Sequence, residues 1–192
     1  MARHKKRSSP RHPGPLAVTC IAAVLAIATP IVSYWEGLKY RPYQDIVGVV
    51  LAIATPTVSY WEGLKYRPYQ DIVGVWTVCY GHTGPDVIRG KTYTKADCDA
   101  FLQADLLEAN TYVRRCIKVP MLPHVAAALV SATFNLGPKV VCGSTLQRKA
   151  LDNDWPGVCA ELDRWKHADG REVRGLILRR ANERALCEGD AS

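Results

Sequence analysis

The chain lacks the features of several protein classes. It has no tract rich in Ser, Gln or Glu, and its 14 glycines and 12 prolines are spread along 192 residues, which excludes collagen and wholesale disorder. None of its seven cysteines forms a C-x-x-C pair, which excludes zinc-ribbon, thioredoxin and haem-attachment motifs. Apolar residues make up 48% of the chain, enough for the core of one soluble domain plus an appendage.

Acidic residues are absent from the first 35 positions, which carry five basic ones: Arg3, Lys5, Lys6, Arg7 and Arg11. The remaining residues hold 20 basic against 18 acidic side chains, so the net charge of +7 is concentrated at one end. A nucleic-acid-binding function would rest on this tail alone, and no nucleic-acid partner is expected.

An uncharged segment, Leu16–Ser33, follows the basic tail. This order predicts an export signal, with a cytoplasmic tail at residues 1–15 and a membrane anchor helix at residues 16–35. Its eight Leu, Ile and Val residues favour insertion by only roughly −4 kcal/mol, so the anchor should be held weakly. Signal-peptide cleavage after Ala28 is the alternative, because Ala26-Ile27-Ala28 is a small-x-small site. A buried core helix behind a disordered tail is a third interpretation.

Both leading interpretations place the rest of the chain outside the cytoplasm, in an oxidising compartment. Six cysteines lie there, and only Cys20 lies in the anchor segment. Six cysteines allow fifteen disulfide connectivities, of which sequence order favours Cys79 with Cys98, Cys116 with Cys142, and Cys159 with Cys187. Free buried thiols are the alternative.

An internal repeat covers residues 24–49, which recur as residues 50–75 with one difference, Ile31 against Thr57. A solenoid needs at least three diverged units, so two near-identical copies indicate a recent tandem duplication, an engineered insertion or an error of sequence assembly. Only the second copy continues into new sequence. The first copy is expected to add a second helix-hairpin segment before the domain. The domain itself should begin at residue 52 and extend to residue 192.

The domain is predicted to be α+β and mainly helical. A short helix should end at Gly63, and residues 66–80 should form a β-hairpin whose loop, Val73–Val75, places Asp71 opposite Thr77. Capping residues, glycines and apolar spacing predict five further helices, at residues 94–115, 123–136, 144–152, 156–167 and 172–187. A small β lobe therefore precedes a larger helical lobe.

The hairpin face carries Glu62, Asp71 and Thr77. Two carboxylates in different environments are what glycoside hydrolysis needs, because one must donate a proton and the other must remain ionised. Glu62, which lies between Trp61 and Leu64, is the better candidate for the acid. A solvated helix end with a turn aspartate is the structural alternative.

The spacing of these three residues, within Trp61-Glu62-Gly63-Leu64 and Tyr80-Gly81-His82-Thr83-Gly84, resembles the active-site segment of the phage lysozymes, the endolysin muramidases of glycoside hydrolase family 24. The resemblance covers about residues 56–188 and includes several later motifs: Phe134-Asn135-Leu136-Gly137, Gly143-Ser144-Thr145-Leu146, Arg164-Trp165, Arg179-Arg180 and Glu183. It implies a two-lobed lysozyme-like fold. The basic tail and the Ala-rich span resemble those of endolysins whose signal anchor is released from the inner membrane into the periplasm.

The resemblance also implies roles for individual residues. Glu62 would be the general acid on the β-1,4 bond between N-acetylmuramic acid and N-acetylglucosamine, and Asp71 and Thr77 would hold the attacking water. Three further residues occupy glycan-contacting positions: Thr83, Phe134 and Ser144. No metal or organic cofactor is implied, and a monomer acting on bacterial peptidoglycan is expected.

Other residues are expected to be structural. His82 should orient the structure through a hydrogen bond, and Trp165 with Arg179-Arg180 should serve packing and ion pairing in the helical lobe. In the first copy Glu36 and Asp45 repeat the carboxylate spacing, but Leu51 replaces the threonine, so this copy should be catalytically empty. The alternative function is a catalytically inactive, membrane-tethered peptidoglycan-binding or lysis-accessory protein, in which the inserted copy disrupts the helix-hairpin junction.

Overall fold

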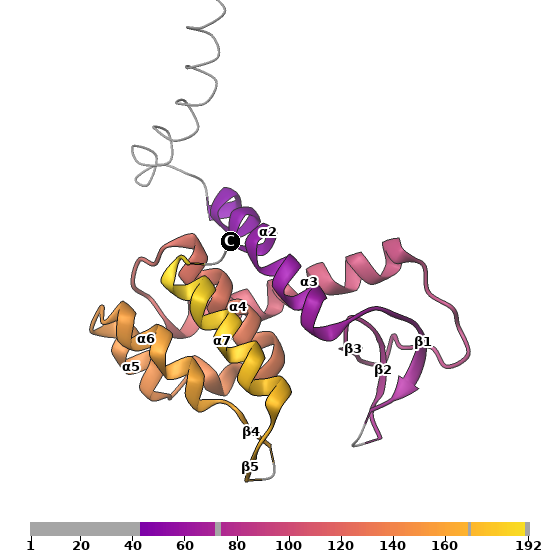
Figure 1. The fold of residues 1–192 in the computed structure, drawn as a ribbon. Helices are drawn as coiled ribbons and strands as arrows, with labels where there is room; N and C mark the ends of the chain where they lie inside the picture. Colours follow the sequence, from indigo (N-terminus) through magenta and orange to yellow (C-terminus); the bar gives the residue numbers. More distant parts are fainter. Residues whose placement is uncertain (1–42, 72–73, 169, 191–192) are drawn as a thin grey trace, which may run out of the picture. The chain divides into compact units, whose positions relative to one another are not determined.

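Six α-helices and two small antiparallel sheets make up the part of the chain described by the computed structural model, residues 43–71, 74–168 and 170–190 (Figure 1). The predicted mainly helical α+β class is confirmed. The anchor segment, Cys20 and residues 24–42 of the first copy lie outside the described residues. Within the described ranges, no helix combines the length and the apolar character needed to cross a bilayer.

Helix α2 (Tyr43–Glu62) begins in the first copy of the repeat and ends in the second. Its buried side chains recur at three- and four-residue spacing and form one apolar face: Val47, Val50, Ala54 and Val58. The predicted helix end before Gly63 is confirmed, but the helix is 20 residues long rather than short.

The sequence Tyr-Gln-Asp-Ile-Val-Gly-Val occurs twice, and its described residues adopt two conformations. Residues 43–49 are helical in α2, whereas Tyr69 and Gln70 end strand β1 and Gly74 has a φ of +83°. In the first copy Val47 aligns with Val50 on the buried face of α2, while the second copy continues into the strand residues Trp76–Cys79. The prediction of a second helix-hairpin segment is therefore wrong for residues 43–49, because the sequence that follows each copy decides its conformation.

Strands β1 (Lys65–Gln70), β2 (Trp76–Cys79) and β3 (His82–Thr83) form an antiparallel sheet in that order. The predicted hairpin is confirmed, and β3 extends it. The predicted pairing of Asp71 with Thr77 is wrong, because Tyr69 lies opposite Thr77. Asp71 instead closes a five-residue turn: its N–H donates to Val75 O (2.9 Å), and its Oδ1 accepts from Val75 N (2.8 Å).

Two long helices follow the sheet. The side chain of Thr94 accepts from Asp97 N at the start of α3 (Lys95–Cys116), and Asp97 Oδ2 accepts from Thr94 N in return, so the predicted capping residues are confirmed. Helix α4 (Pro123–Leu136) starts with a proline and has buried residues from Val125 to Thr133. It packs against α2, α3 and α7 and so forms the centre of the core (Figure 1).

The C-terminal part contains shorter elements. A 3-10 turn, η2 (Pro138–Val140), leads to α5 (Thr145–Leu151), and α6 (Trp155–Glu161) continues into the 3-10 turn η3 (Leu162–Arg164). The expected helix at 156–167 therefore ends early, and a hairpin of β4 (His167–Ala168) and β5 (Arg171–Glu172) follows it. Helix α7 (Arg174–Glu188) ends at Gly189, which has a φ of +84°.

All three favoured disulfides are confirmed: Cys79–Cys98, Cys116–Cys142 and Cys159–Cys187. The first joins β2 to α3, and the last joins α6 to α7. The Cys79–Cys98 disulfide thus links the sheet covalently to α3, which packs against the central helix α4.

Candidate active site

Glu62 is the last residue of α2 and carries a partly buried carboxylate, 19% exposed. Its Oε1 accepts a hydrogen bond of 2.6 Å from Nη1 of Arg179 on α7. Gly81, in the β2–β3 turn, approaches its other oxygen so closely that a Cβ there would lie 3.1 Å from Oε2. The orientation of this carboxylate is therefore set by two segments far from it in sequence.

Tyr69 lies near both predicted carboxylates. Burial raises the pKa of the Tyr69 hydroxyl, and the negative charges of Glu62 and Asp71 raise that pKa further. Because Tyr69 pairs with Thr77 across the sheet, Thr77 shares its face, and the charge of Asp71, in the turn after β1, also reaches Tyr69. The structure thus brings Glu62, Asp71 and Thr77 around Tyr69, a residue that the sequence analysis missed.

Thr77 is only 4% exposed, and its hydroxyl donates to Val75 O at 3.1 Å. A hydroxyl that already donates its hydrogen to a carbonyl can still accept a hydrogen bond from a water molecule. Thr77 can therefore accept a hydrogen from water but has no free hydrogen to donate to it.

Gly81, which lies next to Glu62, is one of the residues that line a cavity of about 290 Å³. This cavity brings together two of the predicted glycan-contacting residues, Thr83 and Phe134, and is also lined by Asp105 and Glu108. Ser144 lines a separate cavity of about 470 Å³, where its hydroxyl caps α5 by accepting from Gln147 N and donates to Val140 O. Ser144 is thus not brought together with Thr83 and Phe134.

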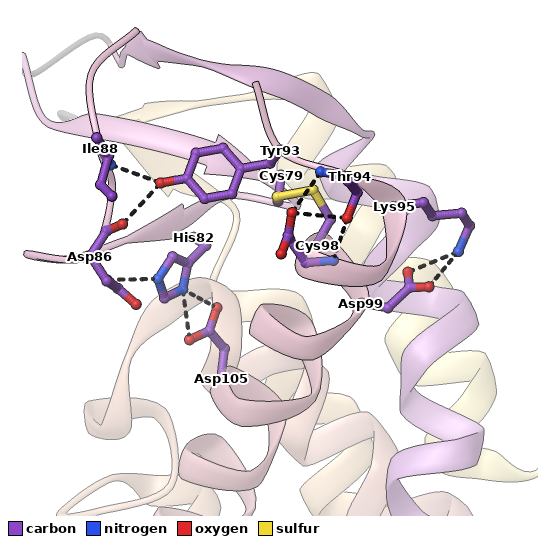
Figure 2. Close-up of a disulfide and its surroundings, with 11 residues drawn as sticks. Cys79, His82, Asp86, Ile88, Tyr93, Thr94, Lys95, Cys98, Asp99 and Asp105 are labelled. Atoms are coloured by element: carbon purple, nitrogen blue, oxygen red, sulfur yellow. Dashed lines mark hydrogen bonds and ion pairs between the residues drawn. A yellow bond between two sulfur atoms is a disulfide. The ribbon is translucent and has the colours of Figure 1, made fainter. Parts of the chain in front are cut away.

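The His82 side chain lies within hydrogen-bonding distance of Asp105, one of the residues that line the cavity at Gly81 (Figure 2). Its Nδ1 lies 2.9 Å from Asp105 Oδ2 on α3, its Nε2 lies 3.1 Å from Asp86 Oδ1, and its ring stacks on Phe101 at 4.1 Å. Burial lowers the pKa of His82, but the hydrogen bonds to Asp105 and Asp86 outweigh it, and the pKa is raised. The predicted hydrogen-bonding role of His82 is confirmed.

Behind Glu62 lies a buried group of charges on α7. Arg179 also donates from Nε to Glu183 Oε1 (3.2 Å), and Arg180 forms an ion pair with Glu183 Oε2 (2.8 Å). The predicted ion pairing of Arg179 and Arg180 is confirmed, and Glu62 is a further partner that the sequence did not indicate. In the described ranges, no cluster of three or more His, Cys, Asp or Glu side chains could hold a metal ion.

The arrangement of a small sheet, a glutamate at a helix end and a helical lobe defines a lysozyme-like muramidase. Residues 59–183 match the phage lysozyme family. The chain belongs to this family and is a muramidase, a glycoside hydrolase.

Individual relatives agree. The SAR-endolysin of Enterobacteria phage P21 is 47% identical over 152 residues, which cover 79% of this chain and 76% of that protein. The SAR-endolysin of Escherichia phage Mu is 37% identical over 151 residues, covering 79% and 72%. Among solved structures, the muramidase domain of SpmX from Asticcacaulis excentricus is similar with a TM-score of 0.64 and 29% identity, covering 70% of this chain and 93% of that one. The active form of the P1 phage endolysin Lyz shares the fold, with a TM-score of 0.67, 22% identity and coverage of 78% and 94%.

Proposed function

We propose that this muramidase is an endolysin that hydrolyses the β-1,4 bond between N-acetylmuramic acid and N-acetylglucosamine in bacterial peptidoglycan and so lyses the host cell. The observation that carries this proposal is the position of Glu62 between Arg179 and Gly81, because Gly81 lines the same cavity as Thr83 and Phe134. The names of the SAR-endolysin relatives support the same activity.

In the proposed reaction Glu62 protonates the leaving sugar oxygen. Asp71 remains ionised and, together with Thr77, holds the water that attacks the opposite side of the sugar ring, which gives inversion. Thr83 and Phe134 contact glycan beside Glu62, and Ser144 contacts a more distant part of the polymer. No metal or organic cofactor takes part, and the enzyme acts as a monomer.

The test compares two glutamates at equivalent positions of the repeat. Glu62→Gln should abolish hydrolysis of purified peptidoglycan, because the amide cannot donate the proton. Glu36→Gln should leave the rate nearly unchanged, since the residue that follows the first copy at the position matching Thr77 is Leu51. Equal losses from the two substitutions would refute the choice of copy.

The inactive, membrane-tethered alternative is not favoured. It required the inserted copy to disrupt the junction between helix and hairpin. Instead, α2 runs without interruption from residue 43 to Glu62, and β1 begins three residues later.

For the route to the cell wall, residues 1–15 would form a cytoplasmic tail, residues 16–35 a releasable signal anchor in the inner membrane, and residues 52–192 the catalytic domain in the periplasm. Dissipating the membrane potential should move uncleaved protein from the membrane fraction to the periplasm. Replacing Ala22, Ala23, Ala26 and Ala28 by leucine should prevent this movement. A soluble form that begins at Thr29 whether or not the potential is intact would instead show signal cleavage.

A further inference from the structure

Helix α7 places three ionisable side chains almost completely out of water. Arg179 is 5% exposed, Arg180 is 1% exposed and Glu183 is 0% exposed. They connect two other helices, because Arg179 binds Glu62 on α2 while Ser131 on α4 donates to Glu183 Oε1 at 2.7 Å. The catalytic glutamate is therefore one end of a continuous polar network that crosses the core.

Burying these charges is costly unless they compensate one another. The network holds two guanidinium groups and two carboxylates, so its formal charge is zero when both carboxylates are ionised. Burial raises the pKa of Glu183, whereas Arg180, Ser131 and Arg179 favour its ionised form. Glu183 contacts both arginines and is the carboxylate that compensates them from inside the core.

This arrangement bears on the protonation of Glu62. A general acid must donate a proton to the leaving oxygen, and the guanidinium charge of Arg179 lies beside the Glu62 carboxylate, with Nη1 at 2.6 Å from Oε1. Glu183 binds the same guanidinium through Nε and offsets its charge. When Glu62 is protonated and Glu183 is ionised, the two arginines and Glu183 together carry a net charge of +1.

We propose that Glu183 is a positioning residue for the reaction: acting through Arg179, it fixes the orientation of the Glu62 carboxylate and offsets the guanidinium charge that lies beside it. This inference rests on the proposed role of Glu62 as general acid. Glu183 is fully buried, so it cannot contact the glycan itself.

Other groups also face Glu62 and must stay constant in the test. They are Arg179 from α7, Tyr69 from β1 and the backbone of Gly81, and Asp71, from the turn after β1, lies near Tyr69. Arg180 acts on Glu62 from behind Arg179. Replacing Glu183 changes none of the groups in direct contact with Glu62. A change in the pH profile would therefore show that Glu183 affects Glu62 through Arg179.

The experiment measures kcat and KM on purified peptidoglycan as a function of pH, using the full-length chain. Glu183→Gln keeps the shape of the side chain but removes its charge. We expect the alkaline limb of the kcat profile to move to lower pH by about one unit, with about a tenfold loss of kcat above the limb and an unchanged KM. Glu188→Gln is the matched control, because it removes the same charge from the exposed end of α7, where Glu188 pairs with Arg184.

A second variant tests the sign of the effect. Arg180→Met removes a positive charge from the same network without touching Glu62, so the alkaline limb should move to higher pH. A residue that only stabilised the fold would lower the folded fraction, measured by circular dichroism, without moving the limb in either direction. If the folded Glu183→Gln protein has the same limb as Glu188→Gln, or if Arg180→Met moves it to lower pH, the inference is overturned. Failure of the proposed function is separately visible, because Glu62→Gln would then remain active.

Discussion

Gly81 lies directly against the carboxylate of Glu62, although 19 positions separate the two residues in sequence. A Cβ at position 81 would lie 3.1 Å from Glu62 Oε2, closer than ordinary van der Waals contact. Gly81 also has a φ of +83°, a conformation that side chains rarely adopt. The turn between β2 and β3 therefore needs glycine both for its backbone conformation and for the space beside the Glu62 carboxylate.

Gly81→Ala should consequently inactivate the enzyme beyond its effect on stability. The backbone strain should cost about 1 to 2 kcal/mol of unfolding free energy, and displacement of the Glu62 carboxylate should lower kcat about a hundredfold. Gly90→Ala is the control, because Gly90 has a φ of +80° with nothing within 4 Å of an added Cβ. It should show the same loss of stability and nearly full activity, and equal activities of the two variants would contradict the explanation.

The His82 cluster should make stability depend on pH. Since the folded-state pKa of His82 is raised, its pairing with Asp105 stabilises fully below the unfolded-state pKa of about 6.5 and is lost as pH rises through the folded-state value. Asp105→Asn should therefore lower the unfolding free energy more at pH 6 than at pH 9 in urea titrations. Asp99→Asn, which removes an exposed pair with Lys95 on the same helix (Figure 2), should have little effect at either pH.

The Cys159–Cys187 disulfide should contribute strongly to stability, because it closes a loop over a separation of 28 residues and holds α7. Replacing both cysteines by alanine should lower the unfolding free energy by about 3.5 kcal/mol and the Tm by about 10 °C. Cys20→Ser should leave both quantities unchanged, since the other six cysteines pair among themselves. A comparable loss in that variant would show that Cys20 takes part in the folded domain.

Deleting residues 24–49 should preserve or raise activity. The deletion joins Ala23 to Val50, and continuation of the helix would then bring Ile21 to the place of buried Val47, so the apolar face of α2 survives. The measurement is peptidoglycan hydrolysis together with membrane fractionation of exporting cells. Loss of activity with intact export would mean that the first copy is required for the fold.

Local signals in the sequence were enough to predict the helix ends. The pair Thr94 and Asp97, the sequence Gly137-Pro138, and Gly189 each act through neighbouring backbone, so their positions follow from short-range chemistry. The order of the disulfides was also predictable, because each joins consecutive cysteines among the six that follow Cys20. Strands β3, β4 and β5, each of two residues, are too short to show a periodic pattern.

The candidate site was less predictable where its contacts are long-range. The partner of Glu62 is Arg179, 117 residues away, and no local pattern could single it out from the other arginines. The sheet register was wrong by two positions, because Asp71 closes the turn with its own side chain and shifts Tyr69 into the place opposite Thr77. The place of Tyr69 in the site therefore follows from the strand pairing, which the sequence alone does not reveal.

The two conformations of one heptapeptide also explain why this chain can carry a repeat. A segment with a strong preference for either helix or turn would force its conformation on whatever precedes the domain. Residues 43–49 instead continue into the helix that follows them, whereas the matching Tyr69 and Gln70 belong to strand β1. This weak intrinsic preference makes the boundary before α2 tolerant of inserted sequence, whereas an insertion after Glu62 would separate this carboxylate from the turn that carries Asp71.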